Sequence, residues 1–500
     1  MRDSRLPPDT PIAVTPDEFR RLGHDLVDRI GEFLESLPAR PVTPQAGAAE
    51  MRALLDAAAP LPEHGGDPAA LLAEASALLF DNSTFNAHPL FFGYITAGPT
   101  PIGILGDFLA SAVNPNCGSW TLAPMATEIE SQTIRWIADL IGYPTDCGGI
   151  LVSGGNVANF TCFLAARVAA ADWPVREQGL RAEEAQHMAV YASAETHTWI
   201  SKAADLYGLG TDSIRWIETD GAQRMRVDAL RAALDRDAAT GVQPLMVVGT
   251  AGSVSTGAVD PLGEIADLCA EHGIWFHIDG AYGGLAAAVP DASPELAHLG
   301  RADSIAVDPH KWLYAPLEAG CAIVRDADAL RHAFSYHPPY YHFGVEATNY
   351  VDFGQQNSRG FRALKIWLAL RHAGRAGYRR MIADDIALAA HLFDQVGRHA
   401  ELEPATLNLS IATFRYVPAA LRARVGEPAA EAELNRINEE LLDRLQKGGE
   451  AFVSNAVIGG RYLLRACVVN FNTTRADVEA LPEIIVRTGR AVERDLALPA

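Results

Sequence analysis

The sequence predicts an α/β protein built around a mostly parallel sheet, with a smaller α+β domain after it. The middle of the chain alternates short apolar runs, bounded by Gly or Asp, with longer periodic segments, which is typical of βα units. Its 500 residues, 49% of them hydrophobic, are enough for one large core and one smaller core. We expect an N-terminal helical segment over 1–85, a large α/β domain over 86–375 and a small C-terminal α+β domain over 376–500.

The first expected element is a helix that begins after Thr15. Thr15 suits the N-cap, a proline takes the first helical position and Glu18 completes a capping box. Apolar residues recur at helical spacing until Pro38 ends the pattern, so one face must pack on something, and another subunit is one candidate. Residues 45–75 are rich in Ala, Pro and Gly, which favours a linker or loosely packed helices.

The strands of the large domain are expected at the apolar runs of the middle region. These runs are MAVYAS, PLMVVGTAG, IWFHIDGAYGG, ADSIAVDPH and GCAIVRD. Between them, LGEIADLCAEHG predicts a compact helix that ends at Gly273. After residue 376 the pattern is helical in IADDIALAAHLFDQV and strand-like in LNLSIATFRYV and YLLRACVVNFN, which predicts the small domain.

Composition argues against several classes of partner. The 41 basic and 62 acidic residues give a net charge of −21, which repels nucleic-acid backbones and anionic membrane surfaces. No apolar run approaches the roughly 18 residues that span a bilayer, and the opening MRDSRLPPDTP lacks a signal peptide's apolar segment. The six cysteines have no CxxC spacing, so we expect reduced thiols in a soluble cytoplasmic protein.

Candidate site residues are sought directly after the apolar runs, because open α/β sheets bind ligands beyond the carboxyl ends of their strands. The chain has only four lysines, Lys202, Lys311, Lys365 and Lys447. Lys365 lies in a helical pattern and Lys447 beside a Gly-Gly turn, so both look structural. Lys202 lies near the start of a predicted helix and is a candidate phosphate ligand. Lys311 alone follows an apolar strand and a Pro-His pair, where a lysine can attack a carbonyl group.

Two other strand ends carry groups that suit carbonyl chemistry. Asp279 ends the run IWFHID, and an aspartate there can pair with a protonated pyridine nitrogen. The turn Gly154-Gly155-Asn156 precedes a helical pattern, whose free N–H groups and dipole can receive a phosphate. Taken alone, an aspartate at a strand end is more often a turn residue, and a Gly-Gly turn before a helix is common.

These segments, in this order, resemble the group II pyridoxal-5'-phosphate (PLP)-dependent decarboxylases, the family of aromatic-L-amino-acid decarboxylase, over nearly the whole chain. The centre of the resemblance is DPHKW, the family's signature around the lysine that binds the cofactor. The other matching segments are FRRLGHDLVDRIGEFLESL, HPLFFGY, GSWTLAPMATEIE, HIDGAYGG, RGFRALKIWLALR and GGRYLLRACVVNFNTT. The resemblance implies the aspartate-aminotransferase-like fold (fold type I) and a homodimer whose N-terminal helices wrap the partner, with the site at the interface.

The resemblance also implies residue roles in binding PLP. Lys311 forms a Schiff base with the cofactor, and Asp279 holds the pyridine nitrogen. His197, in SAETHTW, stacks on the ring, and Ala281 packs against its other side. The remaining implied contacts are Gly155 and Asn156 at the phosphate, His310 and Asp308 close by, and Ser253 in the altered threonine-rich turn GTAGSVSTG.

The implied reaction is decarboxylation of an L-amino acid to its amine and carbon dioxide. The bond that breaks lies perpendicular to the cofactor ring, which accepts the electron pair. The α-carbon then takes a proton, which this family draws from a tyrosine on a loop after the cofactor lysine. Tyr340, in SYHPPYYHF, falls at that place, and a phenol carries its proton at neutral pH. The adjacent Tyr341 is the alternative donor.

The expected substrate is aromatic, such as tyrosine, tryptophan or dopa, and an acidic or other polar amino acid is the alternative. Tyr94 and Thr96, in FFGYIT, resemble the family's pocket wall. NPNCGSW matches a segment where aromatic-substrate members place apolar side chains that reach across the dimer interface. Asn116 and Gly118 stand at those positions here, which predicts a roomier or more polar pocket.

Three rival functions stay open at this point. An aminotransferase or an aldehyde synthase of the same fold would yield a keto acid or an aldehyde, and a tyrosine at position 340 favours the amine. A hydrolytic metalloprotein would use His332, His337 and His342, but their spacing of five suits neither a helix face nor a strand face. An inactive binding protein would share the fold, although every expected cofactor position is chemically intact.

Overall fold

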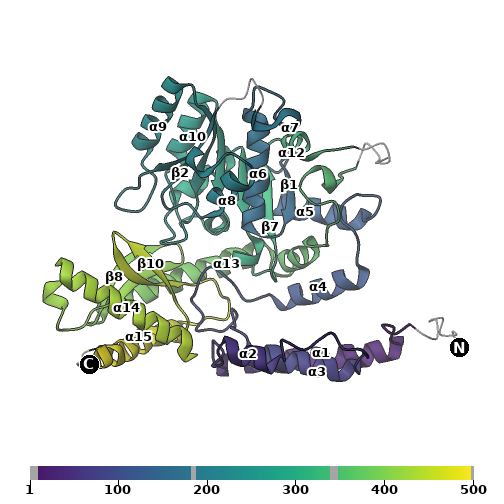
Figure 1. Cartoon of the computed structure of the whole chain (residues 1–500), viewed down its shortest axis with the longest axis vertical. Helices are drawn as coiled ribbons and strands as arrows, with labels where there is room; N and C mark the ends of the chain where they lie inside the picture. Colours follow the sequence, from purple (N-terminus) through teal and green to yellow (C-terminus); the bar gives the residue numbers. More distant parts are fainter. Residues whose placement is uncertain (1–9, 182–186, 338–346, 497–500) are drawn as a thin grey trace.

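The computed structural model describes residues 10–181, 187–337 and 347–496, which form two sheets with helices around them (Figure 1). The larger sheet has seven strands. In spatial order they are β1 (Gly148–Val152), β7 (Gly320–Val324), β6 (Ser304–Val307), β5 (Trp275–Asp279), β4 (Gln243–Thr250), β2 (Met188–Ser193) and β3 (Ile214–Ile217). Among these seven described strands, only β7 runs against the others, so the predicted mostly parallel sheet is confirmed.

The strands of the large sheet coincide with the predicted apolar runs. All six residues of β2, the run MAVYAS, are buried, as expected for a strand covered on both faces. The helices of this part are α4 (Pro101–Val113), α5 (Pro124–Leu140), α6 (Gly155–Ala170), α7 (Val175–Gln178), α8 (Trp199–Leu206), α9 (Val227–Thr240), α10 (Leu262–His272), α11 (Pro309–Trp312) and α12 (Ala327–Phe334). The predicted end of α10 at Gly273 is confirmed, because Gly273 caps it in the left-handed conformation with φ 64°.

The N-terminal segment is an arm of helices, α1 (Pro16–Ser36), α2 (Ala48–Leu54) and α3 (Pro68–Asn82), which extends along one side of the molecule (Figure 1). Thr15 caps α1 as predicted, since its hydroxyl accepts a hydrogen bond from Glu18 N at 3.2 Å. Of the two alternatives for residues 45–75, the structure shows helices, because α2 and the start of α3 lie there. None of the described helices is long and apolar enough to cross a membrane.

The smaller sheet is antiparallel and belongs to the C-terminal part of the chain. Its strands, in spatial order, are β10 (Ser454–Ile458), β11 (Arg461–Cys467), β9 (Ile411–Tyr416) and β8 (Leu402–Asn408). The run LNLSIATFRYV, expected as one strand, contains the end of β8 and all of β9, joined by a turn in which Leu409 has φ 47°. A periodicity of two continues across such a tight turn, so the run alone does not show it. Helices α14 (Pro428–Gly448) and α15 (Arg475–Leu496) pack with this sheet.

Helix α13 (Ala363–Arg398) connects the two parts and reaches from the side of the large sheet to the small one (Figure 1). It is interrupted at Gly374, whose φ of 64° and ψ of 173° are not helical. The small sheet has a buried hydrophobic cluster of its own, and two other clusters lie against the large sheet. The separate cluster of the small sheet supports a domain division close to residue 375, which we keep as a proposal.

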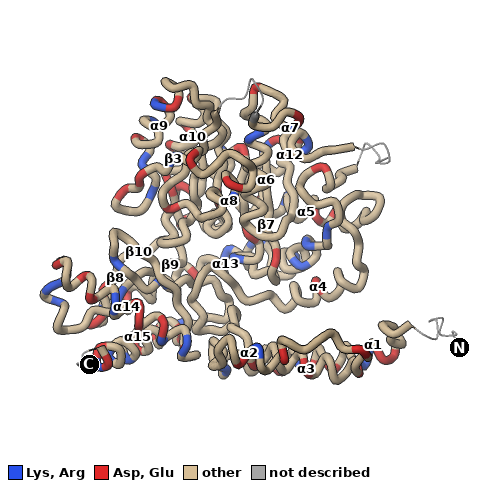
Figure 2. The backbone as a smooth tube through the Cα atoms, in the orientation of Figure 1, with Lys and Arg blue, Asp and Glu red and all other residues tan. Residues whose placement is uncertain are grey.

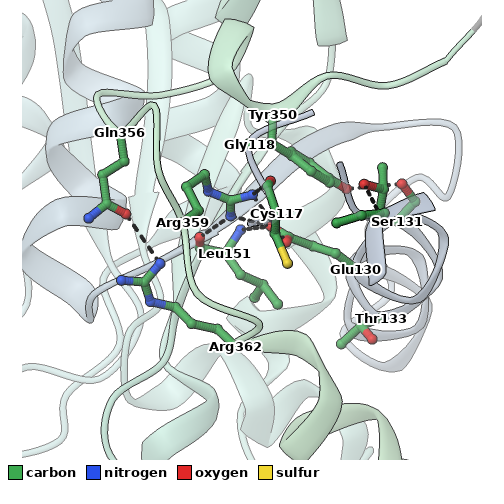
Figure 3. Close-up of polar contacts among 12 residues, drawn as sticks. Cys117, Gly118, Glu130, Ser131, Thr133, Leu151, Tyr350, Gln356, Arg359 and Arg362 are labelled. Atoms are coloured by element: carbon green, nitrogen blue, oxygen red, sulfur yellow. Dashed lines mark hydrogen bonds and ion pairs between the residues drawn. The ribbon is translucent and has the colours of Figure 1, made fainter. Parts of the chain in front are cut away.

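A buried ion pair joins four segments next to β1 (Figure 3). Arg359 Nη2 lies 2.5 Å from Glu130 Oε1, and neither side chain is exposed. Both groups also hold Leu151 of β1, because Glu130 accepts from its N–H at 3.0 Å and Arg359 donates to its carbonyl at 2.6 Å. Arg359 further donates to Cys117 O at 3.0 Å, and its guanidinium lies 4.8 Å from the centre of the Tyr350 ring. The pair therefore fixes the strand that leads into the Gly154-Gly155 turn.

Candidate active site

A cavity of about 580 Å³ opens beyond the carboxyl ends of the parallel strands, where ligands of such sheets bind. The turns and segments after β1, β2, β4, β5 and β6 contribute to its lining, as do β10 and β11 of the small sheet. Ten of the residues proposed from the sequence line it together. They are Tyr94, Thr96, Gly155, Asn156, His197, Asp279, Ala281, Asp308, His310 and Lys311.

Lys311 lies on a single helical turn, α11, directly after β6. Its Nζ is 3.0 Å from Asp308 Oδ2, and the side chains are 19% and 3% exposed. Asp308 Oδ1 is buried and has no hydrogen-bond partner among the described residues. His310 Nδ1 lies 2.5 Å from Ala319 O, which can only accept, so Nδ1 carries the proton. Burial lowers the pKa of His310, which favours the neutral ring.

Asp279 is the last residue of β5 and is 6% exposed. Its Oδ2 accepts a hydrogen bond from Trp199 Nε1 at 2.8 Å, and its Oδ1 accepts one from Ala281 N at 3.2 Å. Trp199 N in turn donates to His197 Nδ1 at 3.2 Å. Burial lowers the pKa of His197, so its neutral form with the proton on Nε2 is favoured. One tryptophan thus fixes both the carboxylate and the imidazole that face the cavity.

The turn after β1 brings backbone N–H groups to the cavity. Gly154 has φ 86°, and α6 begins at Gly155, so the first N–H groups of that helix have no partner within the helix. A Cβ atom on Gly155 would lie 2.5 Å from Asp308 Oδ2, so this position needs glycine. Asn159 Nδ2 donates to Gly155 O at 2.9 Å and holds the turn in place. The arrangement is a helix N-terminus of the kind that binds phosphate.

His277 supports this turn through Asn159, and sequence reasoning did not assign it a role. Its Nε2 lies 2.7 Å from Asn159 Oδ1, and its Nδ1 lies 2.8 Å from Ser304 Oγ. Burial lowers the pKa of His277 to about 4, so the ring is neutral near pH 7. Because Asn159 Oδ1 only accepts, Nε2 carries the proton and Nδ1 accepts from Ser304. Trp275 Nε1 completes the chain by donating to Ser304 Oγ at 2.8 Å.

Arg465 of β11 is a second residue that sequence reasoning missed as part of the site. It is 2% exposed and lines the cavity. Its Nη1 donates to Tyr94 O and to Ser454 Oγ, both at 3.0 Å. Its Nε and Nη2 are buried, and the described part of the chain offers them no hydrogen-bond partner. The signal in the sequence was a charged residue inside the otherwise apolar run YLLRACVV.

Three of the proposed residues do not line the cavity. Ser253 is buried and its hydroxyl lies 3.0 Å from Thr256 Oγ1, while Val254 and Ser255 line the cavity instead. Asn116 and Gly118 lie beside Arg359, since Asn116 Oδ1 accepts from Arg359 N at 3.2 Å. Their predicted position across a dimer interface needs a second subunit and stays a prediction.

The two candidate proton donors, Tyr340 and Tyr341, lie outside the described residues, as does His342 of the metal hypothesis. Of its other histidines, His337 Nε2 lies 2.9 Å from Asp352 Oδ1 and 3.1 Å from Ser335 Oγ. Within residues 10–181, 187–337 and 347–496, no group of three His, Cys, Asp or Glu side chains could hold a metal ion.

The cavity residues fit PLP. A lysine amine and a buried carboxylate suit its aldehyde and its ring nitrogen, and the helix N-terminus at Gly155 suits its phosphate. A Cβ on residue 155 would lie 2.5 Å from Asp308 Oδ2, so glycine keeps the helix N-terminus accessible to a phosphate, and the orphaned Asp308 Oδ1 beside Lys311 can accept one more hydrogen bond.

Comparison with known proteins agrees with this chemistry. Residues 49–417 match the family model of the pyridoxal-dependent decarboxylase conserved domain. An aromatic-L-amino-acid decarboxylase from Bacillus atrophaeus is 33% identical over 472 residues, 93% of this chain and 94% of that protein. A phenylacetaldehyde synthase from Petunia hybrida is 31% identical over 92% of each chain.

A solved structure extends the likeness to three dimensions. The crystal structure of Oryza sativa TDC with PLP and tryptamine has a TM-score of 0.88 and 30% identity, and covers 97% of this chain and 99% of that one. The predicted fold type I architecture and the predicted cofactor, PLP, are confirmed. The protein belongs to the pyridoxal-dependent decarboxylase family, whose members use PLP to remove the carboxylate of amino acids.

Proposed function

We propose that this enzyme decarboxylates an aromatic L-amino acid to the amine and carbon dioxide. The observation that carries the proposal is the convergence of Lys311, Asp279 and His197 on one cavity in a chain of this family. The aromatic class is supported by the relatives, since the bacterial relative is an aromatic-L-amino-acid decarboxylase and the rice structure contains tryptamine.

Different cavity residues bind different parts of PLP. Lys311 holds its aldehyde carbon as a Schiff base, and Asp279 pairs with its ring nitrogen. The first turn of α6, at Gly155 and Asn156, holds the phosphate. Bound PLP supplies a ring that accepts the electron pair left behind when carbon dioxide departs. Because Trp199 occupies one lone pair of Asp279, the carboxylate has a fixed orientation before the cofactor arrives.

His197 and Ala281 contact the ring, and His310 and Asp308 complete its surroundings at the Lys311 turn. Asp308 Oδ2 lies 3.0 Å from Lys311 Nζ. A hydrogen-bond acceptor therefore lies directly beside the amine that attaches to PLP. A neutral His197 adds no second positive charge next to this lysine, which is consistent with the lowered pKa of its ring.

Arg465 draws the carboxylate of the substrate into the cavity. Its buried Nε and Nη2 are two donors of the planar fork that binds carboxylates, while Nη1 is already held by Tyr94 O and Ser454 Oγ. Tyr94 and Thr96 form the wall beside it. Thr96 Oγ1 is buried and lacks a partner in the described chain, so it can hydrogen-bond a polar substituent.

Tyr340 returns the proton to the α-carbon, with Tyr341 as the alternative. A phenol at this point favours the amine over the aldehyde that an aldehyde synthase forms. The Petunia hybrida relative is a phenylacetaldehyde synthase, so aldehyde formation is the second candidate function and a product assay must measure it.

The enzyme works as a homodimer whose interface includes the N-terminal arm and α4. Helix α4 has one charged residue and is drawn almost wholly without charge colours in Figure 2. Its exposed face includes Leu105, Phe108, Leu109 and Val113, each 49–66% exposed. Apolar patches of this kind on soluble proteins mark interfaces, and a two-fold dimer is the commonest arrangement. The site of one subunit then lies close to Asn116 and Gly118 of the other.

The enzyme works in the cytoplasm. Six cysteines, all within the described ranges, are free thiols, and five of them are buried. Unpaired cysteines are typical of reducing compartments.

The test is to incubate the purified holoenzyme with L-tyrosine, L-tryptophan, L-dopa, L-glutamate and L-aspartate, and to measure carbon dioxide, amine, aldehyde and keto acid. We expect equal amounts of carbon dioxide and amine from at least one aromatic substrate. Turnover of the acidic substrates alone would overturn the aromatic assignment, and aldehyde or keto acid as the main product would overturn the reaction.

A further inference from the structure

Two aromatic residues directly after Lys311 are held by one buried carboxylate. Trp312 Nε1 and Tyr314 OH both donate to Asp385 Oδ2, at 2.7 and 2.8 Å. Both aromatic side chains are fully buried, and Asp385 is 2% exposed. Tyr314 has φ 51°, a left-handed conformation that tyrosine rarely adopts, so the packing around it must hold it there.

Asp385 lies on the part of α13 that reaches the small sheet, and it is also bonded to that part of the chain. The backbone N–H of Asn470, after β11, donates to its carboxyl group. Tyr378, about two turns of α13 before Asp385, donates to Leu313 O at 3.0 Å. The turn that carries Lys311 is therefore bonded to α13 on both sides of Leu313.

Trp312 also contacts a residue of the cavity wall. Trp312 stacks on Tyr282, with ring centres 4.8 Å apart and planes 20° apart. Tyr282 lines the cavity three residues after Asp279, and its hydroxyl lies 2.8 Å from Ser410 Oγ. A shift of Trp312 would therefore move both the Lys311 turn and the segment that follows Asp279.

We propose that Asp385 is a positioning residue, whose ionised carboxylate holds Trp312 and Tyr314 and thereby sets the place of Lys311 relative to Asp279. Asp385 lines no part of the cavity, so it acts only through these two side chains. The proposal rests on the proposed role of Lys311 as the residue that holds PLP.

The surroundings of Asp385 make this contact sensitive to pH. Burial raises the pKa of the Asp385 carboxyl to about 7, with Asp384 adding to the rise, and the hydrogen bonds from Tyr314, Trp312 and Asn470 oppose it. The titratable groups around it are Tyr314, Tyr378, Asp384 and Cys467. Burial raises the pKa of Tyr314, Tyr378 and Cys467, so these three stay neutral near pH 7.

The protonation state of Asp385 decides how firmly it holds the two aromatic side chains. Above about pH 7 Asp385 is ionised and accepts charge-assisted hydrogen bonds, which are stronger than those to a neutral carboxyl. Below that pH it is protonated and holds the two aromatic side chains less firmly. Because its folded-state pKa is raised, its contribution to global stability is full at acid pH and is lost as the pH rises through 7. Firm positioning of Lys311 and global stability thus change in opposite directions with pH.

The test compares Asp385→Asn, which keeps the shape and removes the charge, with Asp384→Asn, the same change at an exposed neighbour. The PLP dissociation constant of the apoprotein and the visible absorption band of the holoenzyme are measured from pH 5.5 to 8.5. We expect the wild type to bind PLP more tightly as the pH rises through about 7, and Asp384→Asn to keep this step at a somewhat lower pH, because Asp384 adds to the raised pKa of Asp385. Asp385→Asn should lack this step and bind PLP about tenfold more weakly at the alkaline end.

A second variant keeps the test decisive if Asp385→Asn fails to fold. Tyr314→Phe removes one donor that lowers the pKa of Asp385, so the step should move to higher pH. An unchanged step in Asp385→Asn or in Tyr314→Phe would overturn the proposal. Borohydride reduction of the same samples distinguishes a failure of the positioning role of Asp385 from a failure of the proposed PLP attachment to Lys311. A cofactor label on Lys311 with no effect of Asp385 overturns this inference alone, whereas an unlabelled Lys311 in the wild type overturns the proposed function and this inference together.

Discussion

Replacing Glu130 by glutamine leaves the guanidinium of Arg359 buried without its counter-charge. Both side chains are fully buried, and Glu130 supplies the only carboxylate that the structure shows bonded to Arg359 among the described residues (Figure 3). Glutamine keeps the length of the side chain and one acceptor oxygen. Its NH₂ group, however, would be a donor facing the N–H donors of the Arg359 guanidinium. The backbone carbonyls of Cys117 and Leu151 would remain as acceptors.

The size of the effect follows from the burial. Removing one partner of a fully buried ion pair costs about 3–5 kcal/mol, because the remaining charge cannot reach water. Unfolding entropy is about 2.1 cal/mol/K per residue, so a chain of 500 residues that unfolds as one unit has about 1 kcal/mol/K. Glu130→Gln should therefore lower the Tm by roughly 3–5 °C.

The assay is thermal unfolding of the apoprotein, followed by circular dichroism. Glu128→Gln is the matched control, since Glu128 is exposed on the same helix, and its Tm should stay within about 1 °C of the wild type. The double variant Glu130→Met with Arg359→Met should lose less than the sum of the two single losses, because no charge remains buried alone. A Tm unchanged by Glu130→Gln, or strictly additive losses, would show that the pair does not hold this region together.

Three further predictions concern the cavity. Gly155→Ala should weaken PLP binding about tenfold, while circular dichroism shows an intact fold. The added Cβ would lie 2.5 Å from Asp308 Oδ2 and would turn that carboxylate away from Lys311. An unchanged PLP affinity would contradict this prediction. Arg465→Gln should raise KM for the amino acid by about tenfold or more, with a smaller change in kcat, as measured by steady-state kinetics. A large fall in kcat with an unchanged KM would exclude a contact between Arg465 and the substrate. Tyr340→Phe should keep PLP bound but stop or divert amine formation, and full amine yield would refute its role as proton donor.

The parts of the fold that follow from local patterns could be predicted from the sequence. Apolar runs bounded by Gly or Asp locate strands such as β2, and a capping sequence locates the start of α1, because each depends on neighbouring residues. Lys311 and Asp279 could be placed in one site for the same reason, since Asp279 ends one strand of the sheet and Lys311 follows another.

Contacts between distant segments could not be predicted in this way. Trp199 holds Asp279 from 80 positions away, and Asp385 holds Trp312 from 73 positions away, so each pair depends on how helices pack on the sheet. Ser253 lies in a turn in which Gly252 has φ 91°, and no pattern of residue types fixes which residues of such a turn face the cavity.

The identity of the lysine that holds PLP can be measured by reducing the holoenzyme with borohydride and mapping the labelled peptide by mass spectrometry. We expect the pyridoxyl label on Lys311, its loss in Lys311→Ala, and its retention in Lys447→Ala, whose side chain is 75% exposed. A label on Lys202, Lys365 or Lys447, or no label on protein reconstituted with PLP, would contradict the assignment of this cavity as the active site.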